Sequence, residues 1–200
     1  MKLEERAKEK RKELTDIVKD VIQNYDIQNK EKIASEIIDH FLNITPPKME
    51  LRMEILTLKQ GGVGGGSSTK PGNIWLNWRK LLVDGSESIL TFIGAVAVPW
   101  LIPFAGLVVW NKIWSMLTIE ITERHSVVIW TMWLNRDSEN CIEDQLILDL
   151  VNKELSKYNR PQMNQQELDM LLKDLEKMKC IEKTEGNKWW LREWVKVVYQ

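Results

Sequence analysis

The chain has 200 residues, with 28 Lys and Arg against 29 Asp and Glu and a formal net charge of −1. This length accommodates one medium domain or two small ones. Ordinary apolar (44%) and charged (28%) fractions exclude a globally disordered chain. A protein that neutralises many phosphates carries a basic surplus, so nucleic-acid binding here would need a local basic patch.

Apolar residues at helical spacing predict two helices near the start of the chain, over residues 3–24 and 29–42. Their apolar stripes need a partner, either each other in a dimer or the rest of the chain. Residues 49–58 alternate apolar and polar side chains, which favours a strand, with a helix as the rival. We interpret residues 1–58 as a helical interaction region that binds a protein partner or self-associates.

A run rich in Gly, Ser and Pro, over residues 59–73, has the composition of a flexible linker. It is the clearest candidate for a domain boundary. Lys70 does not make it a phosphate-binding loop, because Pro71 and Gly72 follow where a helix would have to begin.

The next segment, residues 74–117, is predicted to be a Trp-rich apolar helical hairpin. No charged side chain occurs from residue 88 through 111, and Pro99 and Pro103 would divide this run into helices over about 86–97 and 104–117. Each arm is too short to cross a bilayer. A buried hairpin and a membrane-inserted or membrane-lying segment both remain open.

The residues expected to contact a partner or a membrane lie in and before this apolar run. A tryptophan in a proline-bounded apolar loop is typical of an anchor. The competing interpretation is ordinary core. The five candidates are Trp75, Trp78, Trp100, Leu101 and Ile102.

Three amphipathic helices and a hairpin are predicted over residues 118–200. Thr122 is a suitable N-cap for the first helix, the second covers about 142–155, and Asn164 with Glu167 is close to a capping box for the third. A hairpin hinged on Gly186 follows, with a last extended run to Tyr199. The segment Leu168-x-x-Leu171-Leu172-x-x-Leu175-x-x-Met178-x-Cys180-Ile181-Glu182 resembles the third helix and wing of the winged-helix superfamily.

The resemblance implies a mainly α fold with a small C-terminal β-hairpin, in which the third helix can enter the DNA major groove. The DNA contacts would then come from Gln165, Gln166, Lys173 and Lys177. Asp169 and Glu176 share the outward face of this helix and would repel phosphates. We therefore favour protein contact for the domain, with a DNA-binding transcription regulator as the alternative.

Catalytic and metal-binding patterns were sought without success. His125 lies near Glu120 and Glu123, an arrangement that a general base with an orienting carboxylate also shows, but no Ser or Cys nucleophile stands in a recognisable arrangement with it. Cys141 and Cys180 lack zinc-ligand spacing, and reduced thiols of a cytosolic protein are the simpler interpretation.

The N-terminus is charged at once, which is not expected of a secretory signal. We expect a cytoplasmic, non-enzymatic interaction or adaptor module without metal or cofactor. A membrane-associated effector that uses residues 88–111 is the second alternative.

Overall fold

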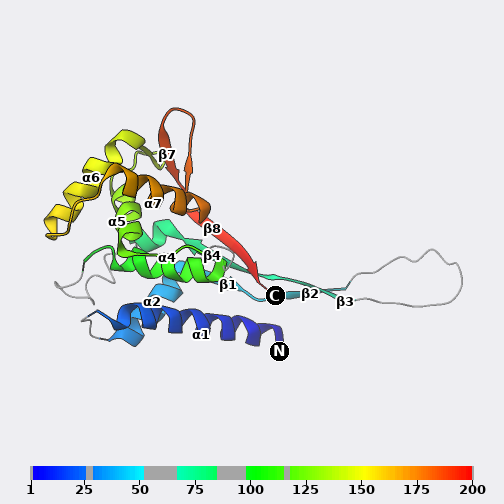
Figure 1. Ribbon diagram of the computed structural model, residues 1–200. Helices are drawn as coiled ribbons and strands as arrows, with labels where there is room; N and C mark the ends of the chain where they lie inside the picture. Colours follow the sequence, from blue (N-terminus) through cyan, green and yellow to red (C-terminus); the bar gives the residue numbers. More distant parts are fainter. Residues whose placement is uncertain (1, 26–28, 52–66, 85–97, 115–117, 200) are drawn as a thin grey trace, which may run out of the picture.

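A computed structural model describes residues 2–25, 29–51, 67–84, 98–114 and 118–199 (Figure 1). Helices predominate among these residues, and three small antiparallel sheets accompany them, which confirms the mainly α class. The helices are α1 (Lys2–Gln23), α2 (Lys30–Phe41), the π-helical turn η1 (Lys80–Asp84), α4 (Leu101–Trp114), α5 (Glu123–Leu134), α6 (Asp144–Lys157) and α7 (Gln165–Lys177).

The strands form sheets of order β1-β4-β8, β2-β3 and β5-β7-β6. In Figure 1, β2 and β3 run away from the body of the molecule, while the hairpin that contains β7 stands above α7 at the top of the view. The strands are β1 (Leu42–Thr45), β2 (Lys48–Leu51), β3 (Ser67–Lys70), β4 (Gly72–Asn77), β5 (Cys141–Glu143), β6 (Ile181–Lys183), β7 (Lys188–Leu191) and β8 (Trp194–Tyr199).

The two predicted N-terminal helices are present as α1 and α2, within one or two residues of the expected bounds. Their apolar stripes, represented by Leu14, Val18 and Ile38, are buried in the chain's own core. An ion pair between Arg11 and Asp39 also joins the two helices. The partner that these stripes require is therefore supplied within the chain, by each other and by α4, which packs on α1.

The predicted linker over residues 59–73 is wrong at its C-terminal end, while residues 59–66 lie outside the described residues. Residues 67–70 form β3, which pairs with β2 in the register Lys48↔Lys70, and β4 begins at Gly72. Residues 48–51 are a strand, as expected for the start of the 49–58 run. Strand pairing overrides the composition here, because β4 is held on both sides by β1 and β8.

The glycine at the start of β4 is required by a close approach. A Cβ at Gly72 would lie 2.4 Å from the Tyr199 ring and 2.5 Å from the carbonyl oxygen of Thr45. The Tyr199 ring lies against Gly72, and its hydroxyl donates a hydrogen bond to the Thr45 carbonyl at 3.1 Å. A glycine that composition assigns to a linker is thus a packing position between three strands.

The predicted apolar hairpin over residues 74–117 differs from the structure. Residues up to Asn77 belong to β4, and the first arm, 86–97, lies outside the described residues. The second arm is present as α4, which begins at Leu101 rather than 104. Pro103 falls in its first turn, where the missing N–H breaks no helical hydrogen bond.

The C-terminal helices follow the prediction closely. Thr122 caps α5 in a capping box whose returning side chain is His125, and the Asn164 side chain accepts a hydrogen bond from Glu167 N at 2.9 Å. Gly186 has a φ of 97° at the turn between β6 and β7. The short strand β5, which sequence patterns did not reveal, enters between α5 and α6 and pairs with β7.

One hydrophobic core runs through the described parts of the chain, from Leu14 of α1 to Val195 of β8. The indole of Trp110 in α4 donates to the Met178 carbonyl at the end of α7, at 2.9 Å. The regions predicted as 1–58 and 118–200 therefore share one core. The final run, Trp194–Tyr199, does not join the β6–β7 hairpin but pairs with β4, in the register Leu76↔Val195.

Candidate functional site

Four of the five residues predicted to contact a partner or a membrane lie in the core. Trp78, Trp100, Leu101 and Ile102 are each at most 2% exposed. Burial of this kind fits the competing interpretation of ordinary core. Trp75 is the exception, because it is only half-buried and lies on the opposite face of β4 from the buried Ile74 and Leu76.

The outer face of the β1-β4-β8 sheet gathers exposed apolar side chains around Trp75. Trp194 stands edge-on to Trp75, with ring centroids 6.4 Å apart and an interplanar angle of 89°. The Lys196 ammonium lies over the Trp75 ring, 4.6 Å from its centroid. Trp194 is 48% exposed and Val198 is 57% exposed. We call these four residues, Trp75, Trp194, Lys196 and Val198, the tryptophan face.

Strand alternation explains why these residues share one side. Successive side chains of a strand point to opposite faces, so Val195 and Val197 turn inward while Trp194, Lys196 and Val198 turn outward. The register places Lys196 directly opposite Trp75, and Trp194 two residues further along, opposite Asn77. Cross-strand neighbours at these positions are within contact distance. The cluster is therefore a direct product of the β4–β8 pairing.

The charge of this sheet is one-sided. Strands β1, β4 and β8 contain no Asp or Glu, and Lys196 is their one Lys or Arg. Within the described part of the chain, the Lys196 ammonium interacts with the Trp75 ring and forms no ion pair with a carboxylate. Arg79 just beyond β4 is paired with Glu193 at 3.5 Å. The face thus combines apolar rings with a cation that no carboxylate of the described chain neutralises.

Sequence reasoning found Trp75 but missed Trp194, Lys196 and Val198. The last run was predicted to be extended, but nothing in the sequence identified β4 as its partner. The β4–β8 pairing joins residues more than a hundred positions apart. Local sequence patterns therefore could not show that the two segments contact each other.

The predicted DNA-contact residues do lie on the exposed side of α7. Two of them are held by carboxylates: Gln165 Nε2 donates to Asp169 Oδ1 at 2.8 Å, and Lys177 Nζ lies 2.9 Å from Asp174 Oδ1. Gln166 and Lys173 are exposed on the same helix. A phosphate approaching α7 would therefore meet carboxylates as well as amides and ammonium groups.

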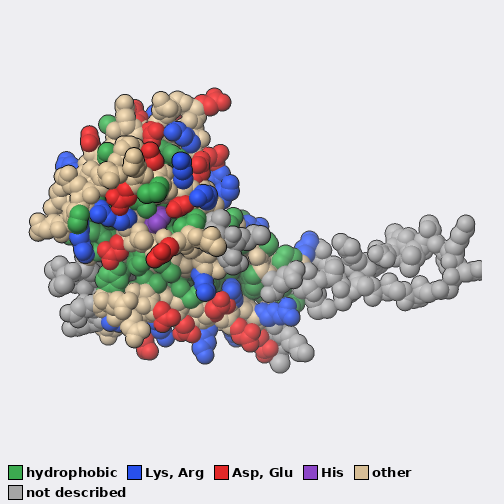
Figure 2. Space-filling model, viewed as in Figure 1, with side chains coloured by type: hydrophobic (Ala, Val, Ile, Leu, Met, Phe, Trp, Pro, Cys, Tyr) green, Lys and Arg blue, Asp and Glu red, His purple; other side chains and the backbone are tan. Residues whose placement is uncertain are grey.

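The β6–β7 hairpin and Arg192 after it also carry basic side chains that are paired with carboxylates. Lys183 Nζ lies 3.2 Å from Asp144 Oδ2, Lys188 Nζ lies 3.5 Å from Asp137 Oδ2, and Arg192 pairs with Glu182. On the face seen in Figure 2, Lys and Arg side chains are interspersed with Asp and Glu side chains in this part of the molecule.

An open cavity of about 430 Å³ lies between the turn of the β6–β7 hairpin and the starts of α6 and α7. Its lining brings two carboxylates and no Lys or Arg, so this cavity is poorly suited to an anion. The lining residues are Glu143, Asp144, Gln145, Gln165, Gly186 and Asn187.

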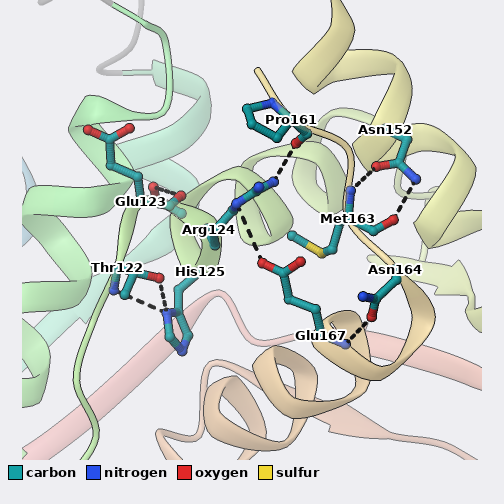
Figure 3. Close-up of polar contacts among 10 residues, drawn as sticks. Thr122, Glu123, Arg124, His125, Asn152, Pro161, Met163, Asn164 and Glu167 are labelled. Carbon is teal, nitrogen blue, oxygen red and sulfur yellow. Dashed lines mark hydrogen bonds and ion pairs between the residues drawn. The ribbon is translucent and has the colours of Figure 1, made fainter.

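A polar junction at the start of α5 ties the C-terminal helices together (Figure 3). Arg124 reaches from α5 to the Pro161 carbonyl at 2.7 Å and to Glu167 of α7 at 3.5 Å. Glu123 accepts a hydrogen bond from the Tyr25 hydroxyl, which follows α1. Burial, followed by this hydrogen bond, raises the pKa of Tyr25 well above its ordinary range.

A small cavity of about 230 Å³ opens at this junction, lined by Trp100, Arg124 and Arg160 among others. Both arginines are already engaged: Arg124 as above, and Arg160 with Glu123 at 3.9 Å. The junction is therefore a set of internal contacts that fixes α1, α5 and α7 relative to one another.

His125, the one candidate general base, is buried at this junction. Its Nδ1 accepts a hydrogen bond from Thr122 N at 3.2 Å, and its Nε2 lies 3.6 Å from Asp174 Oδ2. Burial lowers the pKa of His125, against the opposing effect of Asp174. The neighbouring Ser126 hydroxyl donates a hydrogen bond to the Glu123 carbonyl at 2.7 Å, and the hydroxyl within 3.0 Å of Nδ1 is that of Thr122, the N-cap of the same helix.

The described residues contain no group of three or more His, Cys, Asp or Glu side chains placed to hold a metal ion. None of their helices has both the length and the apolar character needed to cross a bilayer. Compared with protein-family models, curated proteins and solved structures, the chain shows no significant match.

Proposed function

We propose that this chain is a non-enzymatic protein-interaction module whose docking surface is the tryptophan face. The observation that carries the proposal is the exposure of Trp194 and Val198 beside the half-buried Trp75. Tryptophan is enriched among the few interface residues that carry most of the binding free energy. A cation over an indole ring adds an attraction for acidic groups without disturbing the apolar surface.

We further propose that residues 118–191 adopt a winged-helix-type fold that serves as scaffold and protein-contact surface. The order α5, β5, α6, α7, β6, β7, with β7 central in its sheet, supports this assignment. The alternative, a DNA-binding regulator, draws less support because the carboxylates on α7 and the paired lysines of the wing oppose phosphate contact.

The test uses a photo-reactive phenylalanine analogue in place of Val198, introduced into the full chain in extract of its own source cells. We expect a discrete protein adduct that is lost when Trp194→Ala is added. The matched control places the same analogue at Met170, an apolar side chain of α7 that is 61% exposed. This control should give no adduct that depends on Trp194.

The captured protein is then purified and its dissociation constant measured against the full chain. We expect Trp194→Ala to weaken binding by about thirtyfold or more, the size of a hot-spot loss. Equal affinities for the two chains would refute the tryptophan face as a docking surface. Tight, salt-sensitive binding of duplex DNA that is lost in Lys173→Ala/Lys177→Ala would instead favour the DNA-binding alternative.

A further inference from the structure

The strand that carries most of the tryptophan face is also the edge of its sheet. In the order β1-β4-β8, β8 pairs with β4 on one side. On the other side, no described residue forms a hydrogen bond with its backbone. An unpaired strand edge presents a row of N–H and C=O groups that favours pairing with another strand.

The phase of the β4–β8 ladder fixes which groups point outward. Trp78 N donates to the Glu193 carbonyl at 2.8 Å, so this pair is a hydrogen-bonded one. Hydrogen-bonded and non-hydrogen-bonded pairs alternate along an antiparallel ladder. Residues 195, 197 and 199 therefore bond to β4, while the N–H and C=O groups of residues 194, 196 and 198 point away from it.

Devices that normally protect an edge strand are largely missing from β8. Proteins blunt such edges with proline, bulges, inward-pointing charges or several lysines. The six residues of β8 contain no proline and no glycine, and their register with β4 is regular. Their inward side chains, Val195, Val197 and Tyr199, carry no charge. The single deterrent is Lys196, which points outward.

The charge of Lys196 identifies the kind of strand that fits. A partner strand beside β8 would place alternate side chains on the tryptophan face and the others beside Val195 and Val197. On the face, it would meet a cation with no carboxylate partner in the described chain. A second copy of β8 would bring another lysine and no acid. An acidic strand with intervening apolar residues is the complementary one.

We propose that β8 accepts an extended acidic peptide as a fourth strand. The peptide backbone pairs with residues 194, 196 and 198, its carboxylates lie beside Lys196, and its apolar side chains extend the buried row of Val195 and Val197. This inference rests on the proposed function, since it names the partner chemistry of the same surface. The recognition mode is strand addition, in which main-chain hydrogen bonds supply affinity and alternate side chains supply selectivity.

The experiment measures amide hydrogen exchange by NMR on the full chain with a capped eight-residue peptide of alternating valine and glutamate. We expect exchange at the amides of residues 194, 196 and 198 to slow by about tenfold or more at saturation, because these N–H groups gain acceptors. The amides of 195, 197 and 199, already bonded to β4, should change little. A peptide with lysine in place of glutamate should have no effect.

Two variants at one position separate the backbone from the side chain. Val198→Pro removes an outward N–H without breaking a β4–β8 hydrogen bond, whereas Val198→Thr keeps the N–H with a similar side-chain volume. We expect the proline variant to lose peptide binding and the threonine variant to keep it. Circular dichroism and thermal unfolding on both establish that each is folded.

Unchanged exchange at residues 194, 196 and 198 with millimolar acidic peptide would overturn strand addition. So would equal slowing by the lysine peptide, or protection of these amides through dimerisation without peptide. If the Trp194-dependent adduct persists in any of these cases, the tryptophan face remains a docking surface and only strand addition fails. If the adduct also fails, both proposals fall.

Discussion

The two three-stranded sheets among the described residues differ in how their charged side chains are paired. In β5-β7-β6, Lys183 and Lys188 are each matched by a carboxylate within 3.5 Å, and the buried Trp189 indole donates to Asp144 at 2.7 Å. In β1-β4-β8, no strand residue is acidic, and Lys196 meets an indole ring instead. One sheet satisfies its polar groups internally, and the other leaves an apolar and cationic surface open.

The difference indicates where a partner is needed. Paired surface charges gain little from a new partner, since binding would have to break pairs that are already formed. A half-exposed indole, beside an ammonium that no carboxylate of the described residues pairs with, has unmet interactions of both kinds. We therefore expect the two sheets to respond differently to substitution: changes in β5-β7-β6 should lower stability, and changes on the tryptophan face should lower binding.

The largest difference in stability should separate Trp189→Ala from Trp194→Ala. Trp189 is 5% exposed and Trp194 is 48% exposed. Truncating the buried indole should lower the free energy of unfolding by roughly 3–5 kcal/mol, while truncating the exposed one should change it by less than about 1 kcal/mol. Urea unfolding followed by circular dichroism measures both. A similar loss of unfolding free energy for the two variants would make Trp194 a structural residue and contradict the difference between the two sheets.

The next largest effect on stability distinguishes two glycines, Gly72 in β4 and Gly186 in the turn between β6 and β7. Gly72→Ala should lower the free energy of unfolding by about 1–3 kcal/mol, because its Cβ meets the Thr45 carbonyl as well as the Tyr199 ring. Gly186→Ala meets no atom within 4 Å, and its cost of about 1 kcal/mol comes from a φ of 97° alone. Thermal or urea unfolding compares the two.

Adding Tyr199→Ala to each glycine variant tests the cause. Tyr199→Ala should cost less stability in the Gly72 variant than in the parent chain, because it relieves part of the close approach, and should cost the same in the Gly186 variant as in the parent. Equal costs in all three backgrounds would show that the Tyr199 ring does not set the stability of the Gly72 variant.

The same comparison shows what sequence patterns can and cannot predict. The helices were predictable, because caps such as Thr122 and Asn164 and stripes such as Leu168 to Leu175 act within one turn or two. The hairpin at Gly186 was predictable for the same local reason. These signals located most of the C-terminal elements within a few residues, apart from the short strand β5.

The β1-β4-β8 sheet could not be predicted, because its strands are short and its pairings are distant. β1 has four residues, too few for a period to be recognised, and the start of β4 was masked by a glycine-rich composition. Trp75 and Trp78 have the same residue type three positions apart, yet strand alternation and the bend after Asn77 place one outside and the other in the core. That choice depends on β8, which no local pattern contains.

Acid should weaken the helices that carry the β5-β7-β6 sheet. Burial lowers the pKa of His125 in the folded chain below its ordinary 6.5, so the unfolded chain binds the proton more tightly. The free energy of unfolding should therefore be constant above about pH 7 and fall as pH drops below 6.5 toward the folded-state pKa. His125→Gln should remove this slope in urea titrations at successive pH values. A slope that persists in the variant would assign it to other groups.

The smallest stability effect distinguishes the two lysines that face tryptophans. Lys183→Met removes an exposed ion pair with Asp144 and should lower the free energy of unfolding by about 0.5 kcal/mol. A double-mutant cycle with Asp144→Asn isolates that coupling. Lys196→Met breaks no ion pair with the described residues, and its effect should lie within about 0.5 kcal/mol of zero. The loss of the Lys196 charge should appear instead as weaker binding of an acidic peptide, because the methionine keeps the apolar contact with Trp75 and removes only the charge. If the Lys196→Met variant and the parent chain have the same affinity for the acidic peptide, the Lys196 charge contributes nothing to recognition. The contrast between the two sheets would then rest on the exposure of Trp194 alone.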